Sequence, residues 1–311
     1  MRLIVQPDEG LAPILKAVRQ ARKSIDVMIF RFDRRELEKA LADAVERKVA
    51  VRALIAHTAN AGERALRKLE LRLLDAGLTV TRTDDDLRRY HAKYMIVDQS
   101  RLFVFGFNFT ALDMSKSRSF GIEIRARALV RDVLELFEAD VNRQPEPRVN
   151  RSLVISPVNA RERLSAFIRG AKRELLIYDP RLSDVRMIKL IRERIDAGVT
   201  VRVLGRVAKE GRGIACQRAP RLRLHVRAIL RDGADAFLGS LSLRRADLDE
   251  RRELGVIVRD ATAVRRLSQT FDADWQKASP GKGSDCDEDG KGAEPGEQAE
   301  ERAVRKVARA S

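Results

Sequence analysis

The distribution of apolar and polar positions along the chain predicts an α/β protein. Residues 11–23 carry apolar side chains at helical spacing, and residues 24–30 (SIDVMIF) form a compact β-rich run typical of a buried strand. The same pair follows as a helix expected over 34–48 and a strand over 49–56. Because strands alternate with helices, we expect an α/β sandwich with a mixed, mostly parallel sheet flanked by helices.

The pattern continues as far as a segment without periodicity. We expect an edge strand at 3–5, a helix over 60–77, a strand in LTVTRT (78–83), a strand around 119–126 and a helix over 130–141. Residues 144–150 (QPEPRVN) hold two prolines, so we place a linker there.

After this linker the pattern starts again, which indicates an internal duplication. At a shift of 150 positions, VAVRAL (49–54) aligns with VTVRVL (199–204). At a shift of 134 positions, RSFGIEI (118–124) aligns with RELGVIV (252–258), and FEAD (137–140) aligns with FDAD (271–274). The change of shift puts 16 extra residues in the first half between about 56 and 90. Two pseudo-symmetric domains are therefore expected, at 1–146 and 147–278.

The remaining residues, 279–311, are rich in Gly, Ser, Pro and Glu, with an acidic stretch over 285–301 and a basic one over 302–309. This composition predicts a disordered tail without chemistry of its own. The net charge of the chain is +16, and the tail holds six Lys/Arg against eight Asp/Glu, so the body carries about +18.

A body this positive indicates an acidic partner, either anionic lipid headgroups or nucleic acid. The alternative is an arginine-rich but merely solvated surface. Aromatic residues make up only 5% of the chain, which disfavours a surface for stacking bases.

Cysteine content and hydropathy bear on the compartment. Cys216 and Cys286 lie far apart and form no disulfide framework, and the N-terminus lacks the features of a signal peptide. No apolar run approaches the roughly 18 residues that a transmembrane helix requires. We therefore expect a protein of the reducing cytoplasm that contacts membranes at most peripherally.

The candidate chemistry lies in a motif that occurs twice. His91, Lys93 and Asp98 have the spacing His-x-Lys-x-x-x-x-Asp, and the same spacing returns in the second half. The residues of the second copy are His225, Arg227 and Asp232. Two of the three histidines of the chain occupy these matched positions, whereas His57 has no such context.

The residues around the first motif predict a cluster. On a strand, His91 and Lys93 would point to the same side, and a returning strand would bring Gly106 and Asn108 near them. The corresponding residues of the second half are Gly239, Ser240 and Ser242. Asp98 could either touch substrate or fix a turn, and the same alternatives apply to Asp232.

Two histidines, two cations and several neutral donors in one place suit a phosphodiester. The cations would stabilise charge on the non-bridging oxygens, one imidazole could attack phosphorus, and the other could protonate the leaving oxygen. No cluster of residues has metal-ligand spacing, so we expect neither a metal nor another cofactor.

The paired motif, the duplication and the strand–helix opening of each half resemble the phospholipase D superfamily, over residues 1–278. The resemblance implies two α/β domains that form one site, and phosphodiesterase or phosphatidyl transferase activity without a metal. Because both halves lie in one chain, a monomer would suffice to form the site.

The sequence departs from the family pattern at several positions. Phe105-Gly106 replaces Gly-Ser in the first half, and Arg227 and Ser242 replace Lys and Asn in the second. The family tends to place an acidic residue 28 positions after the motif histidine, where it orients the imidazole. Glu253 has this position relative to His225, but the matching residue of the first half is Ser119. Glu123 or Asp113 are the candidates to replace it.

From these observations we expect His91 to be the nucleophile and His225 the general acid, with Glu253 orienting His225. Lys93, Arg227 and Asn108 would bind the phosphate. A phospholipase D-like enzyme that hydrolyses a phospholipid or exchanges its headgroup is the first hypothesis. The alternatives are a nuclease of the same superfamily and a degenerate member that binds phosphate backbones without cleaving them.

Overall fold

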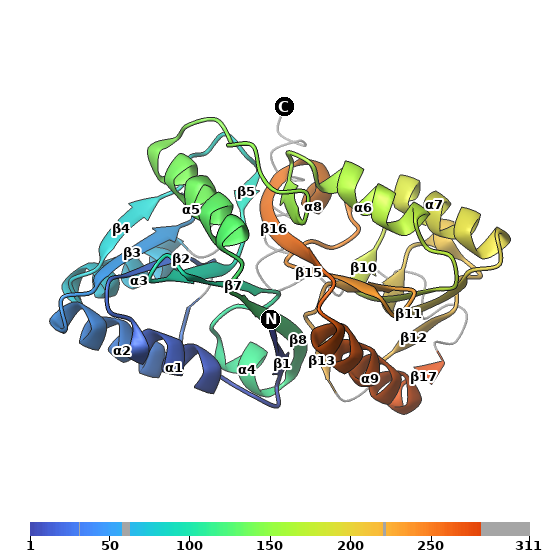
Figure 1. Ribbon diagram of the computed structural model, residues 1–311, viewed down its shortest axis with the longest axis horizontal. Coiled ribbons are helices and arrows are strands. Elements are labelled where there is room, and N and C mark those ends of the chain that lie inside the picture. Colours follow the sequence, from blue (N-terminus) through green and yellow to red (C-terminus); the bar gives the residue numbers. More distant parts are fainter. Residues whose placement is uncertain (31, 58–62, 220–221, 281–311) are drawn as a thin grey trace.

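The computed structural model describes residues 1–30, 32–57, 63–219 and 222–280, which form two halves side by side (Figure 1). Each half contains one β-sheet with helices packed on it. This arrangement confirms the predicted α/β fold with two similar halves.

Within the described residues, the strands of the first sheet lie in the order β1 (Arg2–Gln6), β8 (Ser117–Ile124), β7 (Arg101–Phe105), β6 (Tyr94–Val97), β2 (Ser24–Met28), β3 (Ala50–Ile55) and β4 (Thr79–Arg82). The helices of this half are α1 (Ala12–Gln20), α2 (Arg35–Glu46), α3 (Glu63–Asp75), α4 (Ala111–Ser115) and α5 (Arg127–Asn142). The apolar faces of α1, α2 and α3 cover one side of the sheet, and α5 packs on the other.

The second sheet repeats this order. Its described strands lie in the order β9 (Leu153–Ser156), β16 (Arg251–Val258), β15 (Asp235–Gly239), β14 (Ala228–Arg231), β10 (Glu174–Leu182), β11 (Thr200–Val207) and β12 (Cys216–Arg218), and β17 (Ser279–Pro280) pairs with β12. The helices are α6 (Ala160–Arg169), α7 (Val185–Asp196), α8 (Arg245–Asp249) and α9 (Ala261–Lys277), with a 3-10 turn at Lys209–Gly211. The shared strand order is what an internal duplication predicts.

The expectation of mostly parallel sheets is wrong, although both sheets are mixed. β2, β3 and β4 run parallel, as do β10, β11 and β12, because helices or long loops connect them. The strands that carry and follow the histidine motifs, β6–β7–β8 and β14–β15–β16, pair antiparallel through short connections. Antiparallel pairings therefore outnumber parallel ones among the described strands.

Two short strands cross between the halves. β5 (Arg89–Tyr90), from the first half, pairs with β16 of the second sheet, and β13 (Arg223–Leu224), from the second half, pairs with β8 of the first. Each lies directly before a motif histidine. The exchange places both histidines where the two halves meet.

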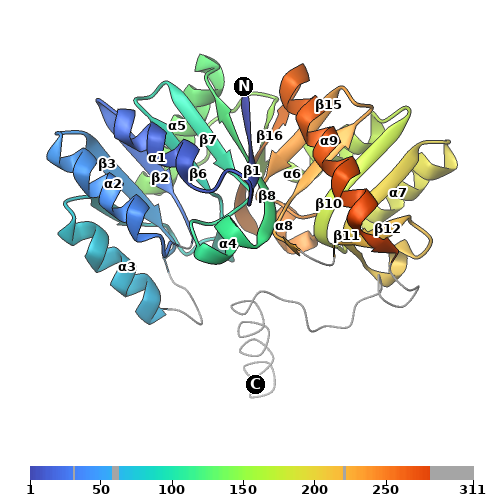
Figure 2. The same cartoon turned by 90° about the horizontal axis from the view of Figure 1, so that it is seen from below.

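One hydrophobic core joins the halves. It contains the inner faces of both sheets together with α5 and α9. Phe120 of the first half packs edge-on against Tyr178 of the second, with ring centroids 5.3 Å apart, and Tyr178 packs against Phe271 at 5.0 Å. Because buried aromatic side chains contribute about 1.5–3 kcal/mol each, this core stabilises the contact between the sheets as well as each sheet. Figure 2 shows α1, α2 and α3 at one end of the molecule and α7 at the other.

The end of the described chain modifies one expectation. Ser279 and Pro280, assigned to the tail, lie in β17, and residues 281–311 lie outside the described residues. The limits expected for the two domains remain predictions. No helix within the described ranges has the length and apolar character needed to cross a bilayer.

Candidate active site

The motif histidines lie in gaps between strands. Residues 91–93 follow β5, which belongs to the second sheet, and precede β6, which belongs to the first. The expected continuous strand through His91 and Lys93 is therefore wrong, because the chain changes sheets at this point. The two side chains nevertheless lie together, with Nζ of Lys93 3.1 Å from each ring nitrogen of His91.

His91 faces a carboxylate from the opposite half. Its Nδ1 lies 2.8 Å from Oε1 of Glu253, and both side chains are buried. The second carboxylate oxygen, Oε2, is buried without a hydrogen-bond partner. The expected pairing of Glu253 with His225 is thus corrected. β5 runs alongside β16, so the nearest histidine to Glu253 is the one that belongs to the other half.

His225 has the reciprocal arrangement. Its Nδ1 lies 3.1 Å from Oδ2 of Asp113, which comes from the first half at the start of α4. The same carboxylate accepts hydrogen bonds from the backbone N–H of Asn108 at 2.9 Å and from Arg223 at 2.8 Å. Burial would raise the pKa of Asp113, but His225, Asn108 and Arg223 outweigh it and hold that pKa well below its usual range. Asp113 is therefore ionised under ordinary conditions.

Asp113, one of the two residues expected to orient His91, contacts His225 instead, so this expectation is corrected. The other, Glu123, forms an ion pair with Arg101 at 2.9 Å on the same sheet. Ser119 is buried and its hydroxyl has no hydrogen-bond partner. The signal for Asp113 was present in the sequence, because Asp247 lies 134 positions further on, at the same place in the second half.

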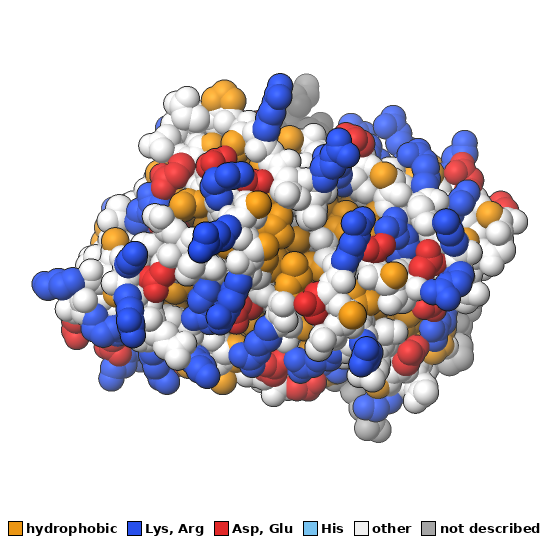
Figure 3. Space-filling view, viewed as in Figure 1, with side chains coloured by type: hydrophobic (Ala, Val, Ile, Leu, Met, Phe, Trp, Pro, Cys, Tyr) orange, Lys and Arg blue, Asp and Glu red, His pale blue; other side chains and the backbone are white. Residues whose placement is uncertain are grey.

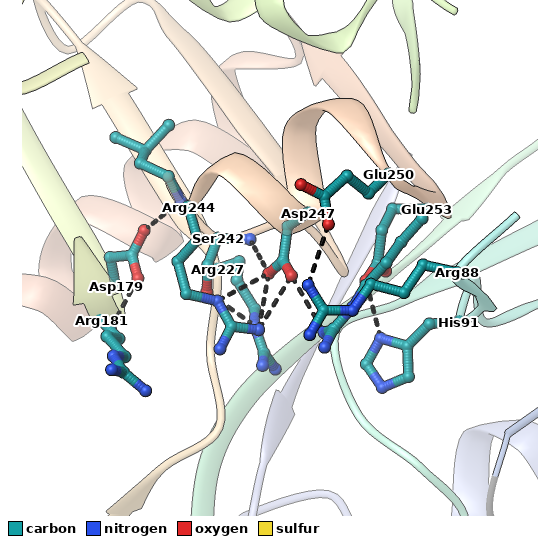
Figure 4. A network of polar contacts seen from close by, with 12 residues as sticks. Arg88, His91, Asp179, Arg181, Arg227, Ser242, Arg244, Asp247, Glu250 and Glu253 are labelled. Carbon is teal, nitrogen blue, oxygen red and sulfur yellow. Dashed lines mark hydrogen bonds and ion pairs between the residues drawn. The ribbon is translucent and has the colours of Figure 1, made fainter. Parts of the chain in front are cut away.

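Asp247 makes the same backbone contact as Asp113 but different side-chain contacts. It accepts the N–H of Ser242 at 3.1 Å, as Asp113 accepts that of Asn108. Its side-chain partners are two arginines, Arg244 at 2.8 Å and Arg251 at 3.0 Å. Figure 4 shows Asp247 beside Arg244, while His91 faces Glu253. Glu253 therefore takes the place beside His91 that symmetry would give to Asp247.

Arg227 is the second cation of the site. It is only 7% exposed, its Nε lies 3.3 Å from Oγ of Ser242, and its Nη1 is buried without a hydrogen-bond partner. Because a buried guanidinium N–H without an acceptor is costly, this geometry is suited to an anion that supplies one. Figure 4 shows Arg227 beside Ser242 and Asp247.

Gly106 and Ser240 both lie against main-chain atoms where the two halves meet. A Cβ on Gly106 would lie 3.0 Å from the carbonyl oxygen of Gly239, so the backbones of the two halves lie close together where Gly replaces the Ser of the family pattern. The hydroxyl of Ser240 is 3.3 Å from both the N–H and the carbonyl oxygen of Leu254. Both residues lie at the seam but contact main chain.

Asp98 and Asp232 lie at the far ends of β6 and β14 from the histidines. Asp98 accepts hydrogen bonds from the backbone N–H groups of residues 22–24, and Asp232 from those of residues 172–174. Burial opposes ionisation of Asp98, but these N–H donors lower its pKa overall. Both carboxylates therefore fix the turn before a central strand, which is the alternative that the sequence left open.

An aromatic contact completes the surroundings of His91. The ring of Phe30, two residues after β2, packs edge-on against the imidazole with centroids 4.8 Å apart, and the guanidinium of Arg89 lies 4.9 Å from the Phe30 centroid. Sequence reasoning did not single out either residue. Among the described residues, no group of three or more His, Cys, Asp or Glu side chains could hold a metal ion.

Comparison with known proteins shows which protein family part of the chain matches. The family described as "Cardiolipin synthase, PLD-like domain" matches residues 14–141, which include the first motif and Asp113. This match identifies a phospholipase D-like domain over residues 14–141. The motif spacing occurs in both halves, with Arg227 in place of Lys in the second, and the two copies meet where the halves join. None of the curated proteins matches this sequence.

Several solved structures are similar in fold to the chain. A polyphosphate kinase from Porphyromonas gingivalis covers 100% of the chain with a TM-score of 0.76 and 18% identity, and the chain spans 53% of that protein, about half its length. A phosphatidylserine synthase from Haemophilus influenzae aligns with 98% of this chain, and the alignment covers 93% of the synthase, with a TM-score of 0.70 and 12% identity. At these identities the likeness shows the fold.

Proposed function

We propose that this protein is a phospholipase D-like enzyme that cleaves or exchanges the phosphodiester of a phospholipid through a phosphohistidine intermediate. The observation that carries the proposal is the crossed pairing of two buried histidines with carboxylates. His91 contacts Glu253, His225 contacts Asp113, and each pair joins the two halves. A carboxylate on Nδ1 fixes the orientation of an imidazole and leaves its Nε2 as the reacting atom.

In the first step Nε2 of His91 attacks phosphorus, and the bond from phosphorus to the leaving oxygen breaks. His225, protonated at the start, gives its Nε2 proton to that oxygen. In the second step water, or an alcohol in a transfer reaction, gives a proton to His225 and attacks the phosphorus. The bond to His91 then breaks, and both histidines return to their initial states.

The surrounding charges support this division of roles. The imidazole that carries the phosphoryl group becomes positive, and Glu253 beside His91 has an Oε2 without a hydrogen-bond partner. The charge of Asp113 is shared with Arg223, so it stabilises a positive His225 less strongly. Lys93, Arg227 and Asn108 would bind the non-bridging oxygens. The turn-fixing Asp98 and Asp232 are not part of this set.

A phospholipid is the substrate that the comparisons favour. The matched family takes its description from cardiolipin synthase, and the phosphatidylserine synthase is similar over nearly its whole length. The positive body of the protein is suited to an anionic membrane surface. We also propose domain limits at 1–146 and 147–278, with a single chain completing the site.

The test is hydrolysis of a chromogenic phosphodiester in excess EDTA by the wild type, His91→Ala and His225→Ala. We expect turnover by the wild type and a loss of at least about 10³-fold in each variant, because each histidine acts in both steps. His57→Ala is the matched control, since His57 lies outside the motifs, and it should retain activity. An inert wild type that still binds anionic vesicles or DNA would favour the degenerate binding protein instead.

The choice between lipid and nucleic acid needs a second measurement. Anionic liposomes and duplex DNA are each added as competitors of the chromogenic reaction and then tested as substrates. Cleavage of lipid with only competitive inhibition by DNA would support the proposal. Cleavage of DNA with no lipid turnover would make the protein a nuclease.

A further inference from the structure

The duplication repeats two blocks that the histidine chemistry does not use. RSFGIEI and RELGVIV place Arg118 and Arg252 at the same position in the two halves, and FEAD and FDAD do the same for Asp140 and Asp274. Arg118 lies on β8 and Arg252 on β16, whereas Asp140 lies on α5 and Asp274 on α9. All four side chains are buried.

These residues form two ion pairs that cross between the halves. Arg252 contacts Oδ1 of Asp140 from Nη2 at 3.1 Å and from Nε at 3.2 Å, and it also donates to Glu146 at 2.9 Å. Arg118 donates to Oδ2 of Asp274 at 2.7 Å and to Oδ1 at 3.1 Å. Each arginine thus binds the last helix of the opposite half. We call these contacts the Arg252 lock and the Arg118 lock.

The backbone of each arginine holds a histidine. The carbonyl oxygen of Arg252 accepts the backbone N–H of His91 at 2.8 Å, and that of Arg118 accepts the N–H of His225 at 3.1 Å. These are the bonds by which β5 and β13 join the sheet of the other half and continue into the motifs. Glu253, whose carboxylate contacts the His91 ring, directly follows Arg252.

A buried ion pair is a poor way to gain stability, because the cost of removing two charges from water offsets most of their attraction. What such a pair does provide is a fixed geometry with little tolerance for displacement. Both locks hold a strand residue that is one hydrogen bond away from a motif histidine. Because the two locks are placed symmetrically beside the two histidines, they are suited to a role in the candidate active site.

We propose that the two crossed locks are positioning devices, in which the Arg252 lock sets the position of His91 and the Arg118 lock sets that of His225. This inference rests on the proposed function, in which both histidines react. Each lock ties three parts together: the terminal helix of one half, a sheet strand of the other, and the histidine whose backbone N–H donates a hydrogen bond to this strand. A lock that is loosened should displace its own histidine and leave the other in place.

The experiment uses the three histidines of the chain as reporters. The full-length protein is labelled in its histidine rings, and the ring resonances of His57, His91 and His225 are recorded by NMR at about pH 8, where histidines are ordinarily neutral. Assignment comes from His57→Gln and His225→Gln. The spectra of Asp140→Asn and Asp274→Asn are then compared with that of the wild type.

We expect Asp140→Asn to shift the His91 resonances and leave those of His225 in place, and Asp274→Asn to do the reverse. Each variant should also lower kcat between about tenfold and hundredfold with KM little changed, because a displaced reacting group loses alignment rather than binding. The matched control is Asp26→Asn. Asp26 is equally buried and pairs with Arg52 at 2.6 Å, but it has no bond to a motif histidine.

The control variant should lose thermal stability while keeping its ring resonances and kcat. If either lock variant moves both histidines, or neither, or if Asp26→Asn gives the same shifts, the locks only stabilise the fold and the proposal is wrong. The resonances are recorded without substrate, so the two proposals can fail independently. If each lock variant shifts only its own histidine but the wild type has no activity, the positioning role is supported and the proposed activity is rejected.

Discussion

At the residue scale, Arg227 and Ser242 show how a departure from the family pattern can be compensated. In the first half Asn108 directs its side-chain amide towards Asp113, at 3.3 Å, and Lys93 lies against His91. In the second half Arg244 and Arg251 already surround Asp247, so an Asn at position 242 would have to compete for it. Ser242 instead accepts from the longer Arg227, and the two substitutions form one pair.

This pairing predicts coupling between the two positions. Arg227→Lys should lower kcat/KM about 10- to 100-fold, because a charge-assisted hydrogen bond of about 1.5–3 kcal/mol to the phosphate is lost. Arg227→Lys/Ser242→Asn should recover part of that loss, because it rebuilds the combination of the first half. A double-mutant cycle on the chromogenic diester measures this coupling. Additive losses would contradict the pairing, and Lys93→Arg is the matched change in the first half.

At the scale of the elements, the expected segments match the observed ones wherever the signal is local. The helices expected over 11–23 and 34–48 are α1 and α2, and the one over 60–77 is α3, which ends at Asp75; residues 60–62 lie outside the described residues. The strand through the first motif could not be predicted correctly. β5 pairs with a strand of the other half, and periodicity carries no information about the pairing partner.

The burial of α5 against the second half gives a prediction on pH. Burial raises the pKa of Asp140 to about 6, although Arg252 opposes this shift. The folded state therefore binds the proton more tightly than the unfolded state, whose reference pKa is 3.8. The contribution of Asp140 to stability is full below about pH 4 and is lost as the pH rises through about 6. The difference is about 3 kcal/mol.

Urea unfolding of the wild type and of Asp140→Asn at about pH 4, 5, 6 and 7 measures this contribution. The free energy of unfolding of the wild type should fall relative to that of the variant across this range, because the amide does not titrate. Other carboxylates cancel in the comparison, including Asp113, whose pKa is lowered. A constant difference between the two proteins would show that Asp140 has an ordinary pKa.

At the scale of the whole molecule, the positive charge is spread widely. On the face shown in Figure 3, Lys and Arg side chains occur over both halves with Asp and Glu between them, and apolar side chains gather near the centre. Positive charge distributed in this way attracts an anionic surface over the whole of this face rather than through one patch.

Membrane binding should accordingly depend on salt. We expect the protein to bind vesicles that contain anionic phospholipid at about 0.05 M salt and to dissociate as the concentration approaches about 0.5 M, because the Debye length falls from above 10 Å to below 5 Å. Vesicles of zwitterionic lipid serve as the control and should not bind. Co-sedimentation measures the bound fraction, and binding unaffected by salt would indicate apolar insertion instead.

The α/β class, the internal duplication and the resemblance to the phospholipase D superfamily could all be inferred from the amino-acid sequence, and so could the candidate site residues. These inferences follow from hydrophobic periodicity, motif spacing and internal repetition. Each of these can be read by comparing segments of the sequence, without knowing which segments contact each other in space. The identity of the two histidines was readable because the repeat placed both at matched positions.

Which carboxylate faces which histidine could be learned only from the folded chain. Glu253 and His91 are 162 residues apart, and the sequence pointed to the nearer His225 instead. The same holds for Asp113 and for the two locks, whose partners come from opposite halves. The physical reason is the strand exchange. Because β5 and β13 each join the other sheet, every contact at the seam pairs residues that are distant in the chain, and no local pattern records such a pairing.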